Sequence, residues 1–331
     1  MRRIAVASAM ILTALATAVA GASTKGTTLN LVAYSTPKTV MGKIVQAWQQ
    51  TPDGSGNNVN AVYGPSTDQA RAVAAGLKAD LVFLSTGDDV NILVDAGLVD
   101  QSWDKQSYDG IEADTVVVFA VRNGNPKHIK SWADLIKPGV QVITPNPFSS
   151  GSAKWNILAA YGAQRHLGKT DRQAQDYVKE LFKHVVSQDT SGRNATNTFL
   201  SGKGDVLLTY ESEAIASRLA GTDIQYVIPR QTMLIELPIA VLKNSSNKDL
   251  ANKFIRFTKT DTAQDLFAQY GFRPVDKKIA AKYASKYPAR PGIFKISEQI
   301  FGGWRAADKK WFASGALMSQ IEGGIGGPTT G

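Results

Sequence analysis

Five segments of this sequence place serine, threonine or glycine where a predicted strand passes into a predicted helix. They are residues 33–37 (AYSTP), 64–69 (GPSTDQ), 147–153 (PFSSGSA), 189–195 (DTSGRNA) and 209–212 (TYES). The N-terminus of a helix has unpaired N–H groups and a partial positive charge. Small residues let an anion approach those donors closely. The five junctions therefore predict a site that binds an anion.

In an open α/β sheet such junctions lie at the carboxyl ends of the strands, so several of them can face one cleft. A small oxyanion buried there needs many donors in place of its water, and helix N-termini with serine hydroxyls can supply them without a countercharge. Ordinary N-capping is the alternative at any single junction, and Ser66 with Gln69 fits a capping box. The run SSGS at 149–152 is more specific, because such a loop after a strand forms an anion-binding nest.

Sequence motifs of hydrolases and metalloenzymes are missing. There is no Gly-x-Ser-x-Gly and no His-Glu-x-x-His, and the run GKT at 168–170 follows a predicted helix rather than the strand that a P-loop requires. His128, His166 and His184 lie in polar contexts beside lysine or arginine, so we expect them at the surface. Without cysteine, three scattered histidines do not predict a zinc site.

Two glutamates beside Tyr210 are the remaining candidates for proton transfer. Glu211 and Glu213 could form an acid–base pair, but residues at i and i+2 point to different sides, which favours capping of the following helix. We expect Arg193, in the fourth junction, to pair with a carboxylate. The sequence therefore predicts no catalytic residue, no metal and no cofactor.

The chain has 331 residues, 43% of them hydrophobic and 20% charged, which is typical of a soluble globular protein of about two domains. The absence of cysteine excludes disulfides, thiolate metal sites, a cysteine nucleophile and a lipidated N-terminal cysteine. The formal net charge is +9, and residues 241–310 carry the excess, with 15 Lys and Arg against 6 Asp and Glu. We interpret this segment as a lysine-rich solvated surface and expect no nucleic acid partner, because no recognisable binding module accompanies it.

The first twenty residues have the pattern of a secretory signal peptide. Arg2 and Arg3 precede an apolar, alanine-rich stretch at 4–15, and Ala18-Val19-Ala20 supplies a small-x-small cleavage pattern. A membrane anchor is the alternative, but the apolar stretch is short. We therefore expect residues 1–20 to be cleaved and the mature protein to be periplasmic.

Strand and helix patterns alternate along the rest of the chain. Apolar alternation or β-branched runs predict strands at 28–34, 58–63, 79–84, 115–121, 140–144, 205–210, 224–228 and 235–242. Apolar residues at helical spacing predict helices at 37–49, 67–77, 88–96, 131–136, 153–167, 171–185 and 212–220. This order indicates an α/β fold with mostly parallel sheets flanked by helices. We expect a flexible Gly/Pro/Thr-rich tail at 323–331.

Three longer motifs carry a resemblance to a known family. They are 131–140 (SWADLIKPGV) continuing to 144–147 (TPNP) and 149–151 (SSG), then 205–214 (DVLLTYESEA) and 301–304 (FGGW). Together they resemble the periplasmic sulfate/thiosulfate-binding proteins of ABC importers, over nearly all of the mature chain.

The resemblance implies a type II periplasmic binding protein of two lobes that close by a hinge on one dehydrated anion. We expect lobe I at 25–115 together with 238–331 and lobe II at 116–237, with crossovers in the strands at 115–121 and 235–242. The implied partners are sulfate or thiosulfate and the ABC permease subunits in the inner membrane, with their cytoplasmic ATPase. A monomer is expected.

The resemblance also implies ligand-binding residues, one motif position at a time. They are a main-chain N–H at Ser35, a hydroxyl at Ser66, a hydroxyl at Ser150 with the N–H groups of Gly151 and Ser152, an N–H at Gly192, and the hydroxyl of Tyr210. Tyr210 stands where the family usually has tryptophan, so its donor has a different reach and angle.

A site that offers only donors and no carboxylate would prefer sulfate over hydrogen phosphate, whose proton needs an acceptor. Two other functions stay open on the sequence: a binder of another tetrahedral oxyanion such as molybdate, and a secreted hydrolase that uses the same cleft.

Overall fold

A computed structural model describes residues 26–327, so the predicted signal peptide at 1–20 lies outside the described residues. The strands are β1 (Thr28–Tyr34), β2 (Asn58–Gly64), β3 (Leu81–Phe83), β4 (Ile111–Val121), β5 (Val142–Pro145), β6 (Val185–Asp189), β7 (Val206–Tyr210), β8 (Gln225–Val227), β9 (Thr232–Val241), β10 (Arg273–Pro274) and β11 (Ile293–Phe294). The α-helices are α1 (Lys38–Trp48), α2 (Ser66–Ala74), α3 (Gly87–Asp95), α4 (Gly151–His166), α5 (Asp171–Lys183), α6 (Gly192–Leu200), α7 (Glu211–Leu219), α8 (Lys248–Thr258), α9 (Asp261–Gln269), α10 (Lys277–Lys282), α11 (Gly303–Trp311) and α12 (Leu317–Ile325). Short 3-10 helices lie at Trp103–Lys105, Ser107–Gly110 and Trp132–Ile136.

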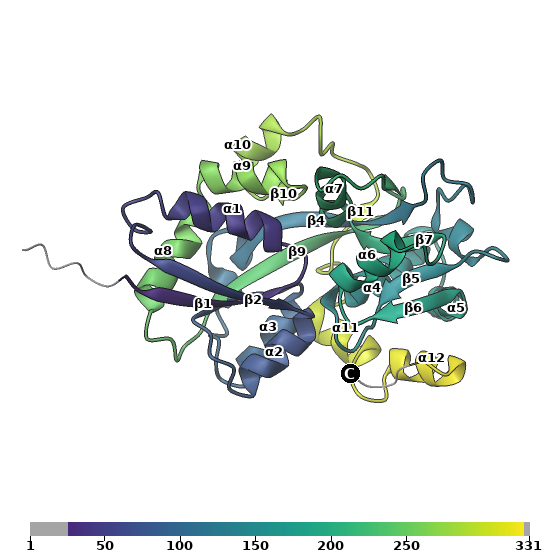
Figure 1. The fold of residues 1–331 in the computed structure, drawn as a ribbon. Coiled ribbons are helices and arrows are strands. Elements are labelled where there is room, and N and C mark those ends of the chain that lie inside the picture. Colours follow the sequence, from purple (N-terminus) through teal and green to yellow (C-terminus); the bar gives the residue numbers. More distant parts are fainter. Residues whose placement is uncertain (1–25, 328–331) are drawn as a thin grey trace, which may run out of the picture.

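The main sheet has the strand order β2-β1-β3-β9-β4-β7-β5-β6 and divides into two halves (Figure 1). In the first half, β1 pairs in parallel with β2 and β3. In the second half, β5 pairs in parallel with β6 and β7. Strands β4 and β9 are antiparallel to each other, and each also pairs within one half: β9 with β3, and β4 with β7. The two long strands therefore link the halves.

Helices cover both faces of the first half, as the strand sequences require. Successive residues of β1 point to opposite faces: Leu31 and Ala33 belong to the main hydrophobic core with one face of α1, whereas Val32 packs with α2 and α3. Figure 1 shows α1 on one side of β1 and β2, and α2 with α3 on the other. Parallel strands buried on both faces need such continuous apolar runs.

The segment from Ile293 onward returns to the second half of the sheet and packs against α4 and α5. Ile293 pairs with Thr232 of β9, and Trp304 meets Trp155 of α4 edge to face, with ring centroids 4.6 Å apart. The Glu322 carboxylate of α12 accepts a hydrogen bond from Gln188 at 3.0 Å. Helix α12 continues to Ile325, within the segment 323–331 expected to be a flexible tail, and residues 328–331 lie outside the described range.

The α/β fold predicted from the sequence is confirmed, and most elements begin within a few residues of their predicted positions. Strand β6 is the clear omission, because the pattern at 171–185 predicts one amphipathic helix, whereas α5 ends at Lys183 and β6 follows. Strand β6 ends the strand order of the sheet and its residues are partly exposed, so it lacks the apolar run that marks a buried strand. None of the helices in residues 26–327 is both long and apolar enough to cross a lipid bilayer.

Two glycines inside helices allow a matched test of how α4 packs. A Cβ on Gly162 of α4 would lie 2.4 Å from Cε2 of Phe294 and 2.6 Å from Cζ of Phe301, whereas a Cβ on Gly42 of α1 meets nothing within 4 Å. We expect Gly162→Ala to lower the free energy of unfolding by about 1–3 kcal/mol, because the two buried rings would have to move. Gly42→Ala should raise it by about 0.5–1 kcal/mol through helix propensity. Urea unfolding measures both, and equal effects would contradict the packing of α4 on the C-terminal segment.

Candidate anion-binding site

The structure brings the predicted junction residues from both halves of the sheet to one place. Ser35 follows β1, Ser66 begins α2, Ser150 precedes Gly151 and Ser152 at the start of α4, Gly192 begins α6, and Tyr210 ends β7. The Tyr210 hydroxyl lies 2.6 Å from Oγ of Ser85, which follows β3 in the first half. The Thr67 N–H of α2 donates to the Ser149 carbonyl of the second half at 3.1 Å. Helix N-termini from the two halves therefore face each other.

At two of these helix starts a glycine lies close to other groups, and at Gly151 a Cβ would clash with them. A Cβ on Gly151 would be 2.8 Å from Oγ of Ser85 and 2.9 Å from Oδ2 of Asp89. A Cβ on Gly192 would be 3.2 Å from Oγ of Ser152 and 3.5 Å from Cγ2 of Thr36. These distances place the starts of α4 and α6 beside each other and beside the first half of the sheet.

Several N–H groups at these helix starts have no acceptor. Within residues 26–327, no backbone or side-chain group accepts a hydrogen bond from the N–H of Ser66, Gly151, Ser152 or Gly192. The same holds for the N–H of Ser35, just after β1. The first N–H groups of a helix have no partner inside the helix, and all but Ser35 of these residues are buried from solvent. The site therefore presents a set of main-chain donors with nothing of the protein opposite them.

Ser66 contributes to the site in a different way from the prediction. Its hydroxyl donates to Oδ2 of Asp89 at 2.6 Å and accepts from the Ser85 N–H at 2.8 Å. Because a hydroxyl has one hydrogen to donate, only the N–H of Ser66 is free as a donor here. The predicted capping box is wrong: Pro65 holds the N-cap position, and the Gln69 amide lies 3.3 Å from the carbonyl oxygen of Ala33.

The hydroxyls of the second half differ in whether they already hydrogen-bond to the protein. The Ser150 side chain is 2% exposed and makes no hydrogen bond within the described residues, so its proton is free to donate. Tyr210 is fully buried, and burial raises the pKa of its hydroxyl far above the ordinary value, although hydrogen bonds with Ser85 and Ser152 oppose the shift. The phenol therefore keeps its proton at neutral pH.

The expectation that no carboxylate lies at the site is wrong, because Asp89 of α3 is fully buried there. Both of its oxygens are engaged: Oδ2 accepts from Ser66, and Oδ1 accepts from the Thr67 hydroxyl at 2.7 Å and lies 3.6 Å from Nζ of Lys154. Lys154 of α4 also pairs with Asp88. Burial disfavours the charge of Lys154, and the two carboxylates outweigh it, so its pKa lies above the ordinary value. The cluster ties the N-terminal turns of α3 and α4 together across the two halves.

Two buried glutamates pair with arginines, which confirms the prediction for Arg193. Arg193 Nη2 lies 3.0 Å from Oε2 of Glu213 and donates to the Thr36 carbonyl at 3.3 Å. Glu211 accepts from Arg273 at 2.8 Å. Burial raises the pKa of both glutamates, while the arginines oppose the shift. Each glutamate thus pairs with a different arginine.

The sequence analysis did not identify Ser85 or Asp89 as residues of the site. It also did not identify the buried hydroxyls of Tyr34 and Thr36, and these two hydroxyls have no hydrogen-bond partner in the described chain. Residues 85–89 follow the predicted strand 79–84 and open a helix, so the rule that found five junctions applies to this sixth one as well. The participation of Asp89 depends on tertiary contacts with α2. No cluster of three or more metal-ligating side chains occurs in residues 26–327.

Comparison with known proteins places this geometry in context. A family model described as bacterial extracellular solute-binding protein matches residues 29–273. The chain is 39% identical to the sulfate-binding protein of Escherichia coli (strain K12), over 83% of this chain and 85% of that protein. It is 34% identical to the thiosulfate-binding protein of Pseudomonas aeruginosa, with the same two coverages. The solved structure of the sulfate-binding protein SubI from Mycobacterium tuberculosis H37Rv superposes with a TM-score of 0.83 at 45% identity, covering 86% of this chain and 99% of that one.

The charge cluster behind the site predicts a pH dependence of stability. Burial raises the pKa of Asp88 to about 6, the charges of Asp308 and Asp89 add to this, and Lys154 opposes it. In the unfolded chain the pKa is about 4, so the folded chain binds more protons between pH 4 and 6. The contribution of Asp88 is therefore fully present below pH 4 and is lost as the pH rises through about 6. Relative to Asp88→Asn, the unaltered chain should gain about 1 kcal/mol of unfolding free energy from pH 7 to pH 5.

Urea unfolding at the two pH values measures this difference. Asp249→Asn, which removes an exposed carboxylate on α8, is the matched control and should follow the unaltered chain. The same pH response in Asp88→Asn and the unaltered chain would show that Asp88 does not titrate in this range.

Proposed function

We propose a ligand and a mode of delivery for this chain, which belongs to the bacterial extracellular solute-binding protein family. It binds one sulfate ion between the two halves of the sheet and delivers it to an ABC importer. The observation that carries the proposal is the convergence of unpaired N–H groups from α2, α4 and α6 with the free Ser150 hydroxyl. The sulfate- and thiosulfate-binding relatives support the choice of ligand.

Main-chain N–H groups suit a ligand that only accepts hydrogen bonds. Sulfate is fully ionised at neutral pH, and each of its oxygens accepts. The proposed donors are the N–H groups of Ser35, Ser66, Gly151, Ser152 and Gly192 with the hydroxyls of Ser150 and Tyr210. The partial positive charge at each helix N-terminus also attracts a dianion, so no charged side chain has to contact the ligand.

The carboxylates near the site face protein donors or cations. Asp89 holds its oxygens toward Ser66, Thr67 and Lys154, and Glu213 is paired with Arg193. The N–H groups and hydroxyls proposed as ligand donors include no acceptor for the proton of hydrogen phosphate, and Asp89 is already held by two hydroxyls. Buried polar groups left without partners discriminate strongly between similar ligands.

We propose two lobes, at 25–115 with 238–331 and at 116–237, and the division of the sheet into two halves supports them. Strands β4 and β9 would carry the hinge, because each pairs with strands of one half and with the other long strand. Contacts between the halves support closure on the ligand: besides Thr67 and Ser149, Nη1 of Arg71 donates to the Phe148 carbonyl at 2.9 Å. The segment 293–325 contacts α4 and α5, so we propose it as a third connection.

Delivery would take place in the periplasm after cleavage of the signal peptide at 1–20, with the monomer docking on permease subunits that are driven by a cytoplasmic ATPase. The relatives are named for binding rather than catalysis. No described histidine hydrogen-bonds to the hydroxyls of the site, as a serine nucleophile with a histidine base would require.

Calorimetry with sulfate, thiosulfate, molybdate and phosphate at pH 7 tests the ligand. We expect sulfate to bind at least a hundredfold more tightly than phosphate, because phosphate brings a proton without an acceptor. Phosphate binding as tight as that of sulfate would overturn the donor-only site. If molybdate binds more tightly than sulfate, the proposed ligand is wrong, but the proposed location of the anion site is unaffected.

Removing a single donor tests the placement of the ligand. Ser150→Ala deletes a buried hydroxyl that has no protein partner, so it should weaken sulfate binding by about 1–3 kcal/mol with little effect on stability. Ser201→Ala is the matched control, since its hydroxyl is exposed and bonds only the Thr198 carbonyl. If both variants bind sulfate like the unaltered chain, Ser150 is not a ligand donor.

A further inference from the structure

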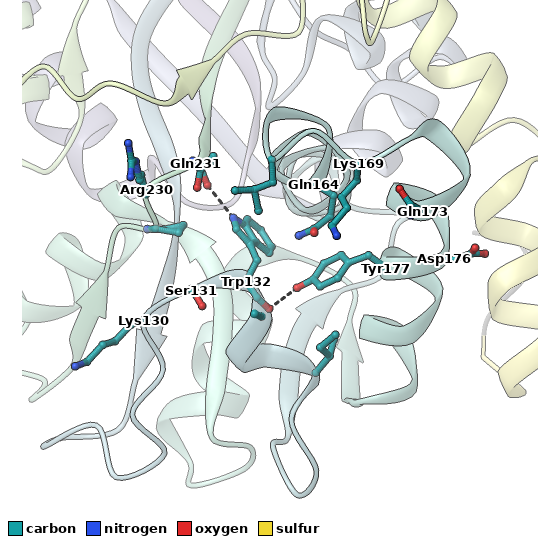
Figure 2. Close-up of a pocket in the computed structure, with 14 residues that line it drawn as sticks. Lys130, Ser131, Trp132, Gln164, Lys169, Gln173, Asp176, Tyr177, Arg230 and Gln231 are labelled. Carbon is teal, nitrogen blue, oxygen red and sulfur yellow. Dashed lines mark hydrogen bonds between the residues drawn. The ribbon is translucent and has the colours of Figure 1, made fainter.

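A second pocket, apart from the anion site, lies where the 3-10 helix Trp132–Ile136, the end of α4 and the start of α5 meet the chain just before β9 (Figure 2). Its volume is about 630 Å³, within the range of small-molecule sites. None of the residues that line it belongs to the five strand-to-helix junctions.

Apolar and aromatic side chains form much of this pocket. Figure 2 shows the rings of Trp132 and Tyr177 in the middle of the lining. Both rings are fixed in place, because the Trp132 indole donates to the Gln231 carbonyl at 2.8 Å and the Tyr177 hydroxyl donates to the Trp132 carbonyl at 2.5 Å. Leu167 also lines the pocket and is 53% exposed. A flat apolar group would cover these surfaces.

Three cations surround the pocket, and none is paired. Lys130, Lys169 and Arg230 are exposed, and their side chains have no hydrogen-bond or ion-pair partner within residues 26–327. The one carboxylate in the lining, Asp176, is paired with Arg172, with Oδ1 3.1 Å from Nε. The local charge therefore favours a negatively charged occupant.

A buried amide adds a polar contact at the wall. Gln164 of α4 is 8% exposed, lines the pocket, and its side-chain amide has no hydrogen-bond partner in the described chain. Figure 2 shows this amide beside Lys169. An amide both donates and accepts, so it can pair with a polar atom of a ligand that enters the pocket.

We propose that this pocket binds a small organic anion, with a flat apolar body against Tyr177 and Leu167 and a carboxylate or sulfonate group among Lys130, Lys169 and Arg230. The site is separate from the proposed sulfate site, and its occupant differs in having an apolar body. Tyr177, Leu167 and Ala133 give apolar contact area, since Trp132 itself is only 2% exposed. The cations select the charge, and the Gln164 amide orients the ligand.

Two fluorescent probes of similar shape test the proposal with the mature chain at saturating sulfate, so that the other site is occupied. 8-Anilino-1-naphthalenesulfonate carries the anionic group, and N-phenyl-1-naphthylamine is its uncharged counterpart. In Lys169→Glu/Arg230→Glu we expect binding of the sulfonate to weaken at least tenfold, while binding of the uncharged probe stays within twofold. Lys277→Glu/Lys309→Glu makes the same change of charge away from the pocket, at two exposed lysines whose side chains have no partner within residues 26–327. This variant should bind both probes like the unaltered chain.

A third variant tests the apolar surface. Ala133 is exposed and lines the pocket, so Ala133→Trp places an indole in it and should weaken both probes at least tenfold. Thermal unfolding and sulfate calorimetry establish that each variant is folded. Equal sulfonate affinity in the two double variants, or unchanged binding of both probes to Ala133→Trp, would overturn the proposal.

Discussion

Unpaired N–H groups at the first turns of helices need an acceptor, and the parallel strands of this chain direct several of them to one place. Each of α2, α4 and α6 begins at the carboxyl end of a strand or shortly after it. The strands of the two halves run in opposite directions, and their carboxyl ends meet because the halves face each other, as the Thr67 N–H bonded to the Ser149 carbonyl shows. Gly151 and Gly192 let these starts approach one another and the loop at Ser85. A buried N–H group without an acceptor lowers the stability of the folded chain, and a bound anion supplies the acceptors. The fold therefore favours anion binding.

A second requirement is that the charges buried around these donors stay balanced. Asp89 orients the hydroxyls of Ser66 and Thr67, and Lys154 from the other half of the sheet compensates it. Glu213 is balanced by Arg193 in the same way. These groups hold the helix starts in place. Removing one partner of a buried pair leaves an uncompensated charge, which costs far more than the pair contributes.

The net charge of +9 therefore has little to do with ligand recognition. Lysines of the basic segment form surface ion pairs, such as Lys278 with Asp261 and Lys282 with Asp265 on neighbouring helices. Exposed pairs of this kind contribute little to stability. Helix α4 links the anion site and the pocket of Figure 2, since its N-terminus lies at the anion site and Gln164 near its C-terminus lines the pocket.

Much of the fold followed from local patterns, because apolar periodicity and strand-to-helix junctions depend on residues near one another in sequence. The predicted strand 28–34 coincides with β1, and the helix predicted at 37–49 differs from α1 by one residue at each end. Strand β6 was missed, since an edge strand with partly exposed residues has no buried run to reveal it. The junctions also located the main-chain donors, which depend on backbone direction and tolerate different side chains.

The sequence by itself determined that helix N-termini would offer donors to an anion and that no cysteine chemistry could operate. Only the tertiary structure decided which hydroxyls are free: Ser66 donates to Asp89, whereas Ser150 has no partner in the described chain. It also decided that a carboxylate lies at the site and that its oxygens are engaged. The physical reason is that a side chain's hydrogen bonds are settled by neighbours distant in sequence, such as Lys154 lying 66 residues from Asp88. A backbone N–H at a helix start lacks a partner inside its helix by local geometry alone.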